Sequence, residues 1–350
     1  MLSLSNKLIT MLAGGALTLL AATVTAAEIT GAGATFPAPV YAKWAEAYKA
    51  ATGTAMNYQA IGSGGGIKQI KAKTVDFGAS DDPMKGPDLE AAGMLQFPAI
   101  IGGIVPVVNL PGIEPGEMVL SGTVLADIFR GAITRWDAAA IARLNPALKL
   151  PSTAITLIYR SDSSGTTAGF TSYLAAVQPV FGTAVGAGKT VNWPTGIGGK
   201  GNAGVAANVT KIQGAIGYVE YAYAEQNKLT HTALINRAGK TVQPSDKSFA
   251  AAADGADWSQ APGFGISLND QAGDHAWPIT SASFVLMHKI ADQPAQSAEV
   301  LKFFKWALEH GQQLALALDY VPLPASVVGQ IESSWSAIKG TNGAPVYAAK

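Results

Sequence analysis

Short apolar segments alternate with segments of helical periodicity along this chain, and no other feature restricts its fold as strongly. Such alternation is typical of βαβ units packed around a mainly parallel sheet. The almost wholly apolar run Ile155–Tyr159 suits a strand that is buried on both faces. In chain order we predict strand Ile29–Thr30, helix Pro39–Thr52, strand Met56–Ile61, helix Ile67–Lys73, strand Val75–Ala79, strand Ile155–Tyr159, helix Thr166–Ala176, strand Ser283–His288 and helices Ala295–Leu318 and Ala325–Ile338.

Two further segments indicate how the domains are joined. Each is a short segment in which apolar, strand-like residues continue past a proline. They are Pro106–Asn109 and Ala276–Ile279, and we interpret both as crossings between two lobes. A double crossing implies one discontinuous lobe and a hinge. We therefore predict an α/β, two-lobed protein with lobe I at 27–107 plus 279–350 and lobe II at 108–278.

Composition narrows the class of function. The 350 residues suffice for two domains, and 48% are hydrophobic while only 14% are charged, which excludes a disordered chain. Lys plus Arg and Asp plus Glu both number 24, so no bulk positive charge attracts nucleic acid. The chain has no cysteine, which removes disulfides, thiolate metal sites and cysteine nucleophiles. Any anion must therefore be bound by a local site.

The N-terminal segment is typical of a secretory signal peptide. A single lysine, Lys7, precedes the apolar run Leu8–Leu20, and small residues then lead to Ala26. The apolar run is shorter than the ~20 residues that a membrane-spanning helix needs. We predict a signal peptide over residues 1–26, cleaved near Ala26, and an exported, periplasmic protein.

Three Gly- and Ser-rich loops each follow a predicted strand and precede a predicted helix. They are Gly31–Pro37, Gly62–Gly66 and Ser161–Thr167. Each offers unpaired backbone N–H groups and the positive end of a helix dipole, which suit a small tetrahedral oxyanion. Any one of these loops alone is also explained by ordinary helix capping. None completes a P-loop, a dinucleotide fingerprint or a G-x-S-x-G nucleophile elbow.

Two charged residues next to these loops suggest what they recognise. Arg160 ends a predicted strand, and its guanidinium can pair with tetrahedral oxygens, although a surface salt bridge with Asp162 is the alternative. Asp81 also follows a strand, and a carboxylate beside an anion is repulsive unless the anion carries a proton. Phosphate keeps a proton near neutral pH and sulfate does not, so Asp81 favours phosphate.

Several ordered motifs together resemble one family. The sequence resembles the PstS family of periplasmic phosphate-binding proteins, which serve the bacterial high-affinity phosphate ABC transporter, over nearly the whole chain after residue 27. The motifs that carry the resemblance are Thr30–Pro39, Ile61–Gly66, Thr74–Asp81, Ser164–Thr166, Trp136–Asp137, Leu144–Pro146, Gly196–Asn202, Ala215–Tyr221 and Trp277–Thr280.

The resemblance implies a type II periplasmic-binding-protein (Venus-flytrap) fold that closes over one dehydrated phosphate. It assigns Asp81 as acceptor of the phosphate proton and Arg160 as the charged contact, supported by Asp162. It assigns no ligand contact to Gly196–Asn202, which we interpret as a structural turn before a helix at Ala203–Val209. The remaining implied ligand residues, which donate through hydroxyls and backbone N–H groups, are Thr35, Phe36, Ser63, Ser164, Gly165 and Thr166.

The expected function is therefore phosphate capture and delivery to the membrane permease subunits of an ABC transporter, by a monomer without catalytic residues, metal or cofactor and without nucleic acid as a partner. One alternative is a secreted phosphatase, but the four histidines are scattered and form no metal-ligand pair. A second alternative is another oxyanion. Asp81 argues against sulfate and does not exclude arsenate, which is also protonated.

Overall fold

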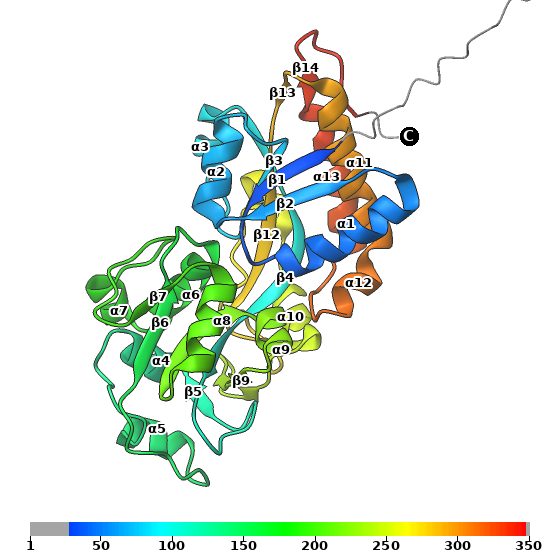
Figure 1. Cartoon of the computed structure of the whole chain (residues 1–350). Coiled ribbons are helices and arrows are strands. Elements are labelled where there is room, and N and C mark those ends of the chain that lie inside the picture. The colour runs from blue at the N-terminus through cyan, green and yellow to red at the C-terminus, as the bar shows by residue number, and fades with distance from the viewer. Residues whose placement is uncertain (1–27, 348–350) are drawn as a thin grey trace, which may run out of the picture.

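The computed structural model describes residues 28–347, which form two α/β lobes, one above the other in Figure 1. The upper lobe contains three parallel strands, with β1 in contact with both β2 and β3. The lower lobe contains the parallel pairs β6–β8 and β6–β7. These strands are β1 (Ile29–Gly33), β2 (Met56–Ala60), β3 (Phe77–Ser80), β6 (Thr156–Arg160), β7 (Ile197–Gly199) and β8 (Ala215–Glu220).

One long strand, β4 (Met94–Val108), runs from one lobe into the other. It pairs antiparallel with β12 (Thr280–His288) through Gly103, and with β8 from Ile104 onward. The strand order is β2-β1-β3-β12-β4-β8-β6-β7, with β9 (Thr230–His231) also paired to β4. The prediction of a mainly parallel sheet is thus correct within each lobe and wrong at the centre. There, β4 is antiparallel to its neighbours β12 and β8.

The predicted crossing at Pro106–Asn109 includes the end of a strand. Pro106 and Val108 belong to β4, and the Trp277 indole donates to the carbonyl of Ile104 at 3.0 Å. β4 changes partner between Gly103 and Ile104, a few residues before the predicted lobe boundary at 107/108. The lobe limits themselves stay a prediction.

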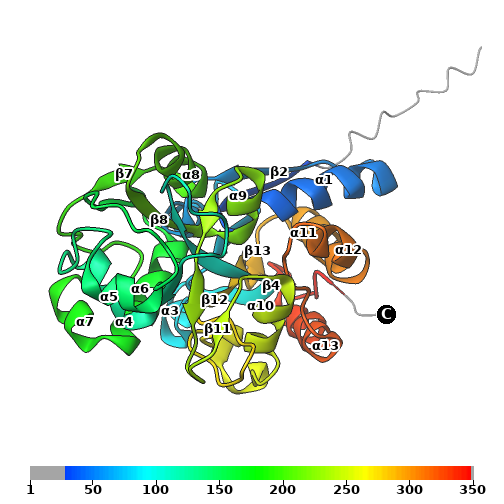
Figure 2. The same cartoon turned by 90° about the horizontal axis from the view of Figure 1, so that it is seen from below.

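Helices cover both faces of the sheet (Figures 1 and 2). The longer ones are α1 (Ala38–Thr52), α2 (Ser63–Lys71), α4 (Gly122–Phe129), α6 (Gly165–Val177), α8 (Gly201–Lys211), α10 (Asp246–Ala253), α11 (Pro294–His310) and α13 (Ala325–Ser334). The shorter helices are α3 (Gly86–Ala91), α5 (Ala139–Leu144), α7 (Pro179–Ala184), α9 (Tyr221–Gln226) and α12 (Gln312–Leu316). The small strands are β5 (Val119–Ser121), β10 (Ala233–Ile235), β11 (Thr241–Val242), β13 (Ile290–Ala291) and β14 (Lys339–Gly340).

The long helix predicted over Ala295–Leu318 is two helices, α11 and α12, separated at Gly311. The Gly311 carbonyl accepts a hydrogen bond from the buried Trp44 indole at 2.9 Å. A Cβ at position 311 would lie 2.4 Å from that indole nitrogen, so glycine permits the close approach. Periodicity alone missed the break because apolar residues continue at helical spacing on both sides.

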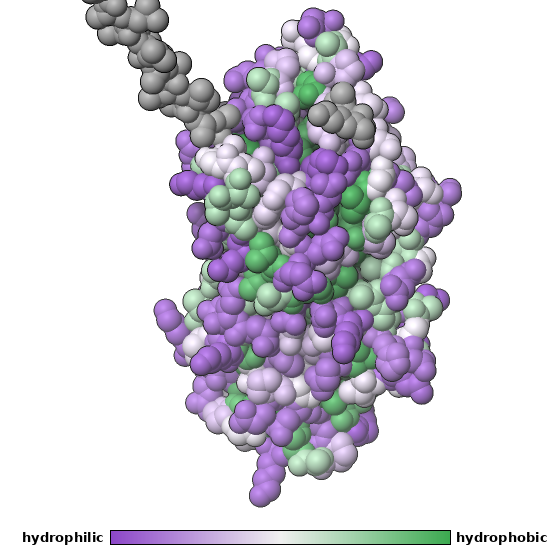
Figure 3. All heavy atoms as spheres, turned by 90° about the vertical axis from the view of Figure 1, so that its right-hand side faces the viewer, coloured by the Kyte–Doolittle hydropathy of each residue, from purple (hydrophilic) through white to green (hydrophobic). Residues whose placement is uncertain are grey.

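Figure 3 shows a face on which polar side chains predominate and apolar ones form small patches between them. Among residues 28–347, no helix is both long and apolar enough to span a bilayer. The predicted signal peptide over residues 1–26 lies outside the described residues. The aromatic residues of α11 belong to the core: Phe303 and Phe304 are fully buried, and Trp306 packs at its edge.

The glycine-rich loop after β2 differs from its prediction because its glycines form the first turn of α2. Gly66 packs so closely on the sheet that a Cβ there would lie 2.4 Å from the Gly33 Cα and 2.5 Å from the Ala32 carbonyl oxygen. These neighbours are backbone atoms, which cannot rotate away from an added Cβ as a flexible side chain could. Gly66 therefore fixes how near the start of α2 lies to β1.

We expect Gly66→Ala to destabilise the protein by about 1–3 kcal/mol, because the added methyl forces α2 away from the sheet. The control is Gly329→Ala in α13, where an added Cβ would have no neighbour within 4 Å, and which should be neutral or stabilise by up to ~1 kcal/mol. Urea unfolding of both variants measures the difference. Equal stability of the two variants would contradict the close packing.

Candidate functional site

The predicted site residues come from segments far apart in the sequence, and all lie at carboxyl ends of strands or at the helix starts that follow. Asp81 follows β3, Arg160 ends β6, and Ser164 caps the N-terminus of α6. Loops at the carboxyl ends of strands are where α/β sheets bind ligands. The side chains or backbones of Thr35, Phe36, Ser63, Asp81, Arg160, Ser164, Gly165 and Thr166 are all buried.

Hydrogen bonds join these segments directly. The Ser63 hydroxyl oxygen accepts from the Gly165 N–H at 3.0 Å and from the Asp81 N–H at 3.2 Å. Gly165 opens α6 in the lower lobe, whereas Ser63 and Asp81 belong to the upper lobe. A Cβ on Gly165 would lie 2.5 Å from the Ser63 hydroxyl, so the lobes are closed against each other here.

Arg160 is held by Asp162 in a buried ion pair. Its Nε donates to Asp162 Oδ1 at 2.8 Å, its Nη2 lies 2.5 Å from Oδ2, and its Nη1 donates to the Thr166 hydroxyl at 3.2 Å. Partial burial tends to raise the pKa of Asp162, but the bonds and charge of Arg160 and the Gly201 N–H outweigh it, so this pKa lies below its usual range. Because the guanidinium side chain is only 1% exposed, Arg160 does not form the surface salt bridge that the sequence left open.

Asp81 is buried, and within residues 28–347 no basic side chain forms an ion pair with it. Its Oδ1 accepts from the Ser283 hydroxyl of β12 at 2.8 Å. Burial raises the pKa of Asp81 to about 7, while the bond from Ser283 and the charge of Arg160 work to lower it. A carboxyl with a pKa near neutrality in a closed site changes readily between accepting and donating a proton.

Sequence reasoning missed the residues that connect the two lobes around the site. The Asn202 amide donates to the Thr35 hydroxyl at 2.8 Å, and the Tyr223 hydroxyl donates to the Thr35 carbonyl at 2.7 Å. Asn202 lies in the stretch interpreted as a structural turn, and α8 begins at Gly201 rather than at the predicted Ala203. A lone asparagine at the start of a helix is usually a capping residue, so nothing in the sequence marks it.

A buried carboxyl, Glu220, also lies between the lobes. The Tyr320 hydroxyl lies 2.6 Å from the Phe36 carbonyl oxygen and 2.7 Å from Glu220 Oε2. The Tyr320 hydroxyl donates to both acceptors, so its single proton is shared between the Phe36 carbonyl and Glu220 Oε2. Burial raises the pKa of Glu220 well above its usual value, although the bonds from the Ala222 N–H and the Tyr320 hydroxyl act to lower it.

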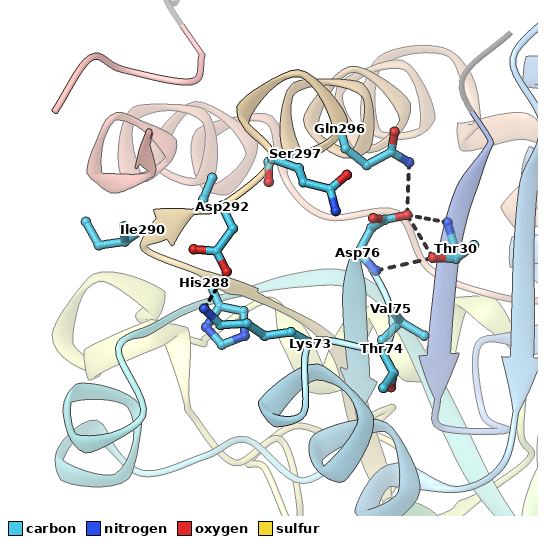
Figure 4. Close-up of a pocket in the computed structure, with 12 residues that line it drawn as sticks. Thr30, Lys73, Thr74, Val75, Asp76, His288, Ile290, Asp292, Gln296 and Ser297 are labelled. Carbon is cyan, nitrogen blue, oxygen red and sulfur yellow. Dashed lines mark hydrogen bonds and ion pairs between the residues drawn. The ribbon is translucent and has the colours of Figure 1, made fainter. Parts of the chain in front are cut away.

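The polar pocket in Figure 4 is not this site. It has a volume of about 220 Å³ and lies beside the start of β1 and of α11, at the opposite end of the strand from the Thr35 loop. The carboxylates of Asp76 and Asp292 line this pocket and would repel an anion. Asp76 accepts hydrogen bonds from Thr30 and Gln296, and Asp292 forms an ion pair with Lys73. Among residues 28–347, no three His, Cys, Asp or Glu side chains could together hold a metal ion.

Two lobes joined by a long strand, with a buried polar site between them, define a periplasmic-binding-protein architecture, and the comparisons agree. The PBP superfamily domain matches residues 21–310. A phosphate-binding protein bound with phosphate, described as periplasmic and of high affinity (PfluDING), shares the fold: the TM-score is 0.72 at 19% identity, covering 92% of this chain and 99% of that one. A Stenotrophomonas maltophilia phosphate-binding protein matches with a TM-score of 0.68 at 21% identity, covering 91% and 96%.

Sequence relatives narrow the class to one family. The chain is 55% identical to the phosphate-binding protein PstS of Pasteurella multocida, over 93% of this chain and 95% of that protein. It is 56% identical to PstS of Haemophilus influenzae, over 88% and 92%. The chain belongs to the PstS family, as its motifs predict.

The buried carboxyl of Asp81 predicts a pH-dependent stability. Its folded-state pKa of about 7 exceeds the ordinary value of 3.8, so its contribution to stability is complete below pH ~4 and is lost as the pH rises through 7. We expect Asp81→Asn to stabilise the phosphate-free protein at pH 8, by up to about 4 kcal/mol, and much less at pH 5. Thermal unfolding at both pH values measures this.

The control for that experiment is Asp274→Asn, which removes an exposed carboxylate and should change the melting temperature little at either pH. A loss of stability in Asp81→Asn at pH 8, or an equal gain at pH 5 and pH 8, would show that Asp81 bears no desolvation cost.

Proposed function

We propose that this protein binds inorganic phosphate and delivers it to the permease subunits of an ABC transporter. One observation carries the proposal: a closed, buried site that combines hydrogen-bond donors and a held guanidinium with the buried carboxyl of Asp81, whose hydrogen-bond partner is the Ser283 hydroxyl. Donors stabilise a tetrahedral oxyanion, and the carboxyl accepts the proton that such an anion retains. The names of the relatives, phosphate-binding protein PstS, support the same substrate.

Each site residue has a role in this proposal. The Arg160 guanidinium, oriented by Asp162, supplies charge, and Asp81 accepts the phosphate proton. The start of α6, with its backbone N–H groups and helix dipole, donates to the anion. The other donors are the backbone or hydroxyl groups of Thr35, Phe36, Ser63, Ser164, Gly165 and Thr166.

Capture and release require the lobes to open and close. We propose lobe I at 27–107 plus 279–350 and lobe II at 108–278, joined by two crossings that act as a hinge. The contacts that would break on opening include those of Ser63 with Gly165, Thr35 with Asn202 and Tyr223, and Asp82 with Lys189. Because these contacts are polar, and water can replace them when the lobes open, a modest change in ligand binding can shift the balance between the two states.

The proposed role places the protein outside the cytoplasm. We propose that residues 1–26 are a signal peptide removed near Ala26, and that the rest works in the periplasm as a monomer. We further propose that it binds phosphate without turning over phosphate esters. The relatives are named as binding proteins, which supports this role over that of a secreted phosphatase. Incubation with a phosphate ester should release no phosphate.

Calorimetric titration of phosphate-stripped protein at pH 8 tests the substrate. We expect phosphate to bind with micromolar or tighter affinity and sulfate to give no heat, because ionised Asp81 repels an anion without a proton. In Asp81→Asn we expect phosphate affinity to fall about 10- to 100-fold and sulfate binding to appear, since the repelled acceptor becomes a neutral amide. Arsenate, which is protonated like phosphate, should compete with it in the unmodified protein.

The control for the titration is again Asp274→Asn, which should bind phosphate and reject sulfate as the unmodified protein does. Sulfate binding as strong as phosphate binding in the unmodified protein would refute the role of Asp81. Absence of phosphate binding would refute the proposed function itself.

A further inference from the structure

Asn202 has no place in the site that the sequence predicts, yet it is tied to that site by several hydrogen bonds. It is the second residue of α8, its side chain is fully buried, and it belongs to the lower lobe. Its amide nitrogen contacts the hydroxyls of Thr35 at 2.8 Å and of Thr166 at 3.3 Å. Its backbone N–H also donates to the Thr35 hydroxyl, at 3.2 Å.

The orientation of the Asn202 amide is fixed by its other end. Asn202 Oδ1 accepts from the backbone N–H of Glu220 at 3.1 Å. A backbone N–H only donates, so the oxygen must face Glu220 and the NH₂ group must face the two threonines. The amide is thus a donor to both hydroxyls.

These donors determine where the hydroxyl protons go. A threonine hydroxyl has two lone pairs and one proton. Both lone pairs of Thr35 receive N–H groups of Asn202, and those of Thr166 receive Asn202 Nδ2 and Arg160 Nη1. With their acceptor capacity filled, both hydroxyls are left to donate their protons to whatever occupies the site.

We propose that Asn202 is a positioning residue that sets the Thr35 and Thr166 hydroxyls as donors toward the bound anion, and that it reaches Thr35 only when the lobes are closed. The proposal rests on the proposed function. Thr35 lies in the upper lobe and Asn202 in the lower lobe, so their bond exists only in the closed arrangement. The amide therefore couples closure to the alignment of the Thr35 hydroxyl: in an open site this hydroxyl rotates freely, and in a closed site it is aligned as a donor beside Thr166.

A double-mutant cycle on phosphate affinity tests whether Asn202 acts through Thr35. We expect Asn202→Ala and Thr35→Val each to weaken phosphate binding about 10- to 100-fold, the range for one hydrogen bond to a charged group. If Asn202 works by orienting the Thr35 hydroxyl, the double variant should bind within about threefold of Asn202→Ala alone, since Asn202→Ala has already disabled the hydroxyl that Thr35→Val removes. Residues that contribute independently would multiply, to about 100- to 10,000-fold.

Two further variants separate this role from a structural one. Asn208→Ala removes an asparagine on the same helix, whose amide donates to the Gly198 carbonyl at 3.4 Å, and should leave phosphate affinity unchanged. Asn202→Asp keeps the shape but replaces the donor with an acceptor that captures the hydroxyl protons, and should weaken binding more than Asn202→Ala does. If Asn202→Ala does not fold, Asn202→Ser replaces it in the cycle.

The outcomes are distinct. Multiplicative effects in the cycle, or Asn202→Asp binding as tightly as the unmodified protein, would overturn the positioning role while phosphate binding by the unmodified protein still stands. Failure of the unmodified protein to bind phosphate would overturn the proposed function instead. Non-additivity together with an inert Asn208→Ala supports the proposal.

Discussion

The free-energy cost of burying charged groups determines how the side chains of this site are paired. A guanidinium or a carboxylate that is removed from water loses several kcal/mol of solvation free energy, and only a close ion pair or hydrogen bonds compensate for that loss. The ion pair with Asp162 compensates for the desolvation of Arg160, whereas the hydrogen-bond partner of Asp81 is an uncharged hydroxyl, that of Ser283. The raised pKa of Asp81 records that imbalance. Such a group is destabilising in the empty protein and becomes favourable when a ligand supplies a proton to accept.

The fold brings these groups together by a general property of parallel sheets. Loops at the carboxyl ends of strands meet at one edge, and closure of two such edges against each other places the Ser63 loop beside the start of α6. β4 runs from one lobe into the other and keeps the two lobes joined whether the site is open or closed. The polar network across the interface, from Asn202 to Tyr320, sets which closed arrangement forms.

Much of this could be predicted from the sequence, for identifiable reasons. Strands such as β6 have apolar runs that periodicity detects, and the loops at Thr35, Ser63 and Ser164 carry glycines and hydroxyls at recognisable places. The antiparallel centre could not be predicted, because pairing direction depends on how the chain crosses between lobes. Ser283 and Asn202 were missed because each resembles an ordinary strand or capping residue, and only tertiary contacts reveal what they touch.

A crystal structure of the protein grown with phosphate shows whether Asp81 and Arg160 hold the anion together. We expect tetrahedral density enclosed between the lobes, within hydrogen-bond distance of a carboxylate oxygen of Asp81 and of the Arg160 guanidinium, with no water between them. Phosphate bound elsewhere, or bound there with Asp81 turned away and out of contact, would contradict this expectation.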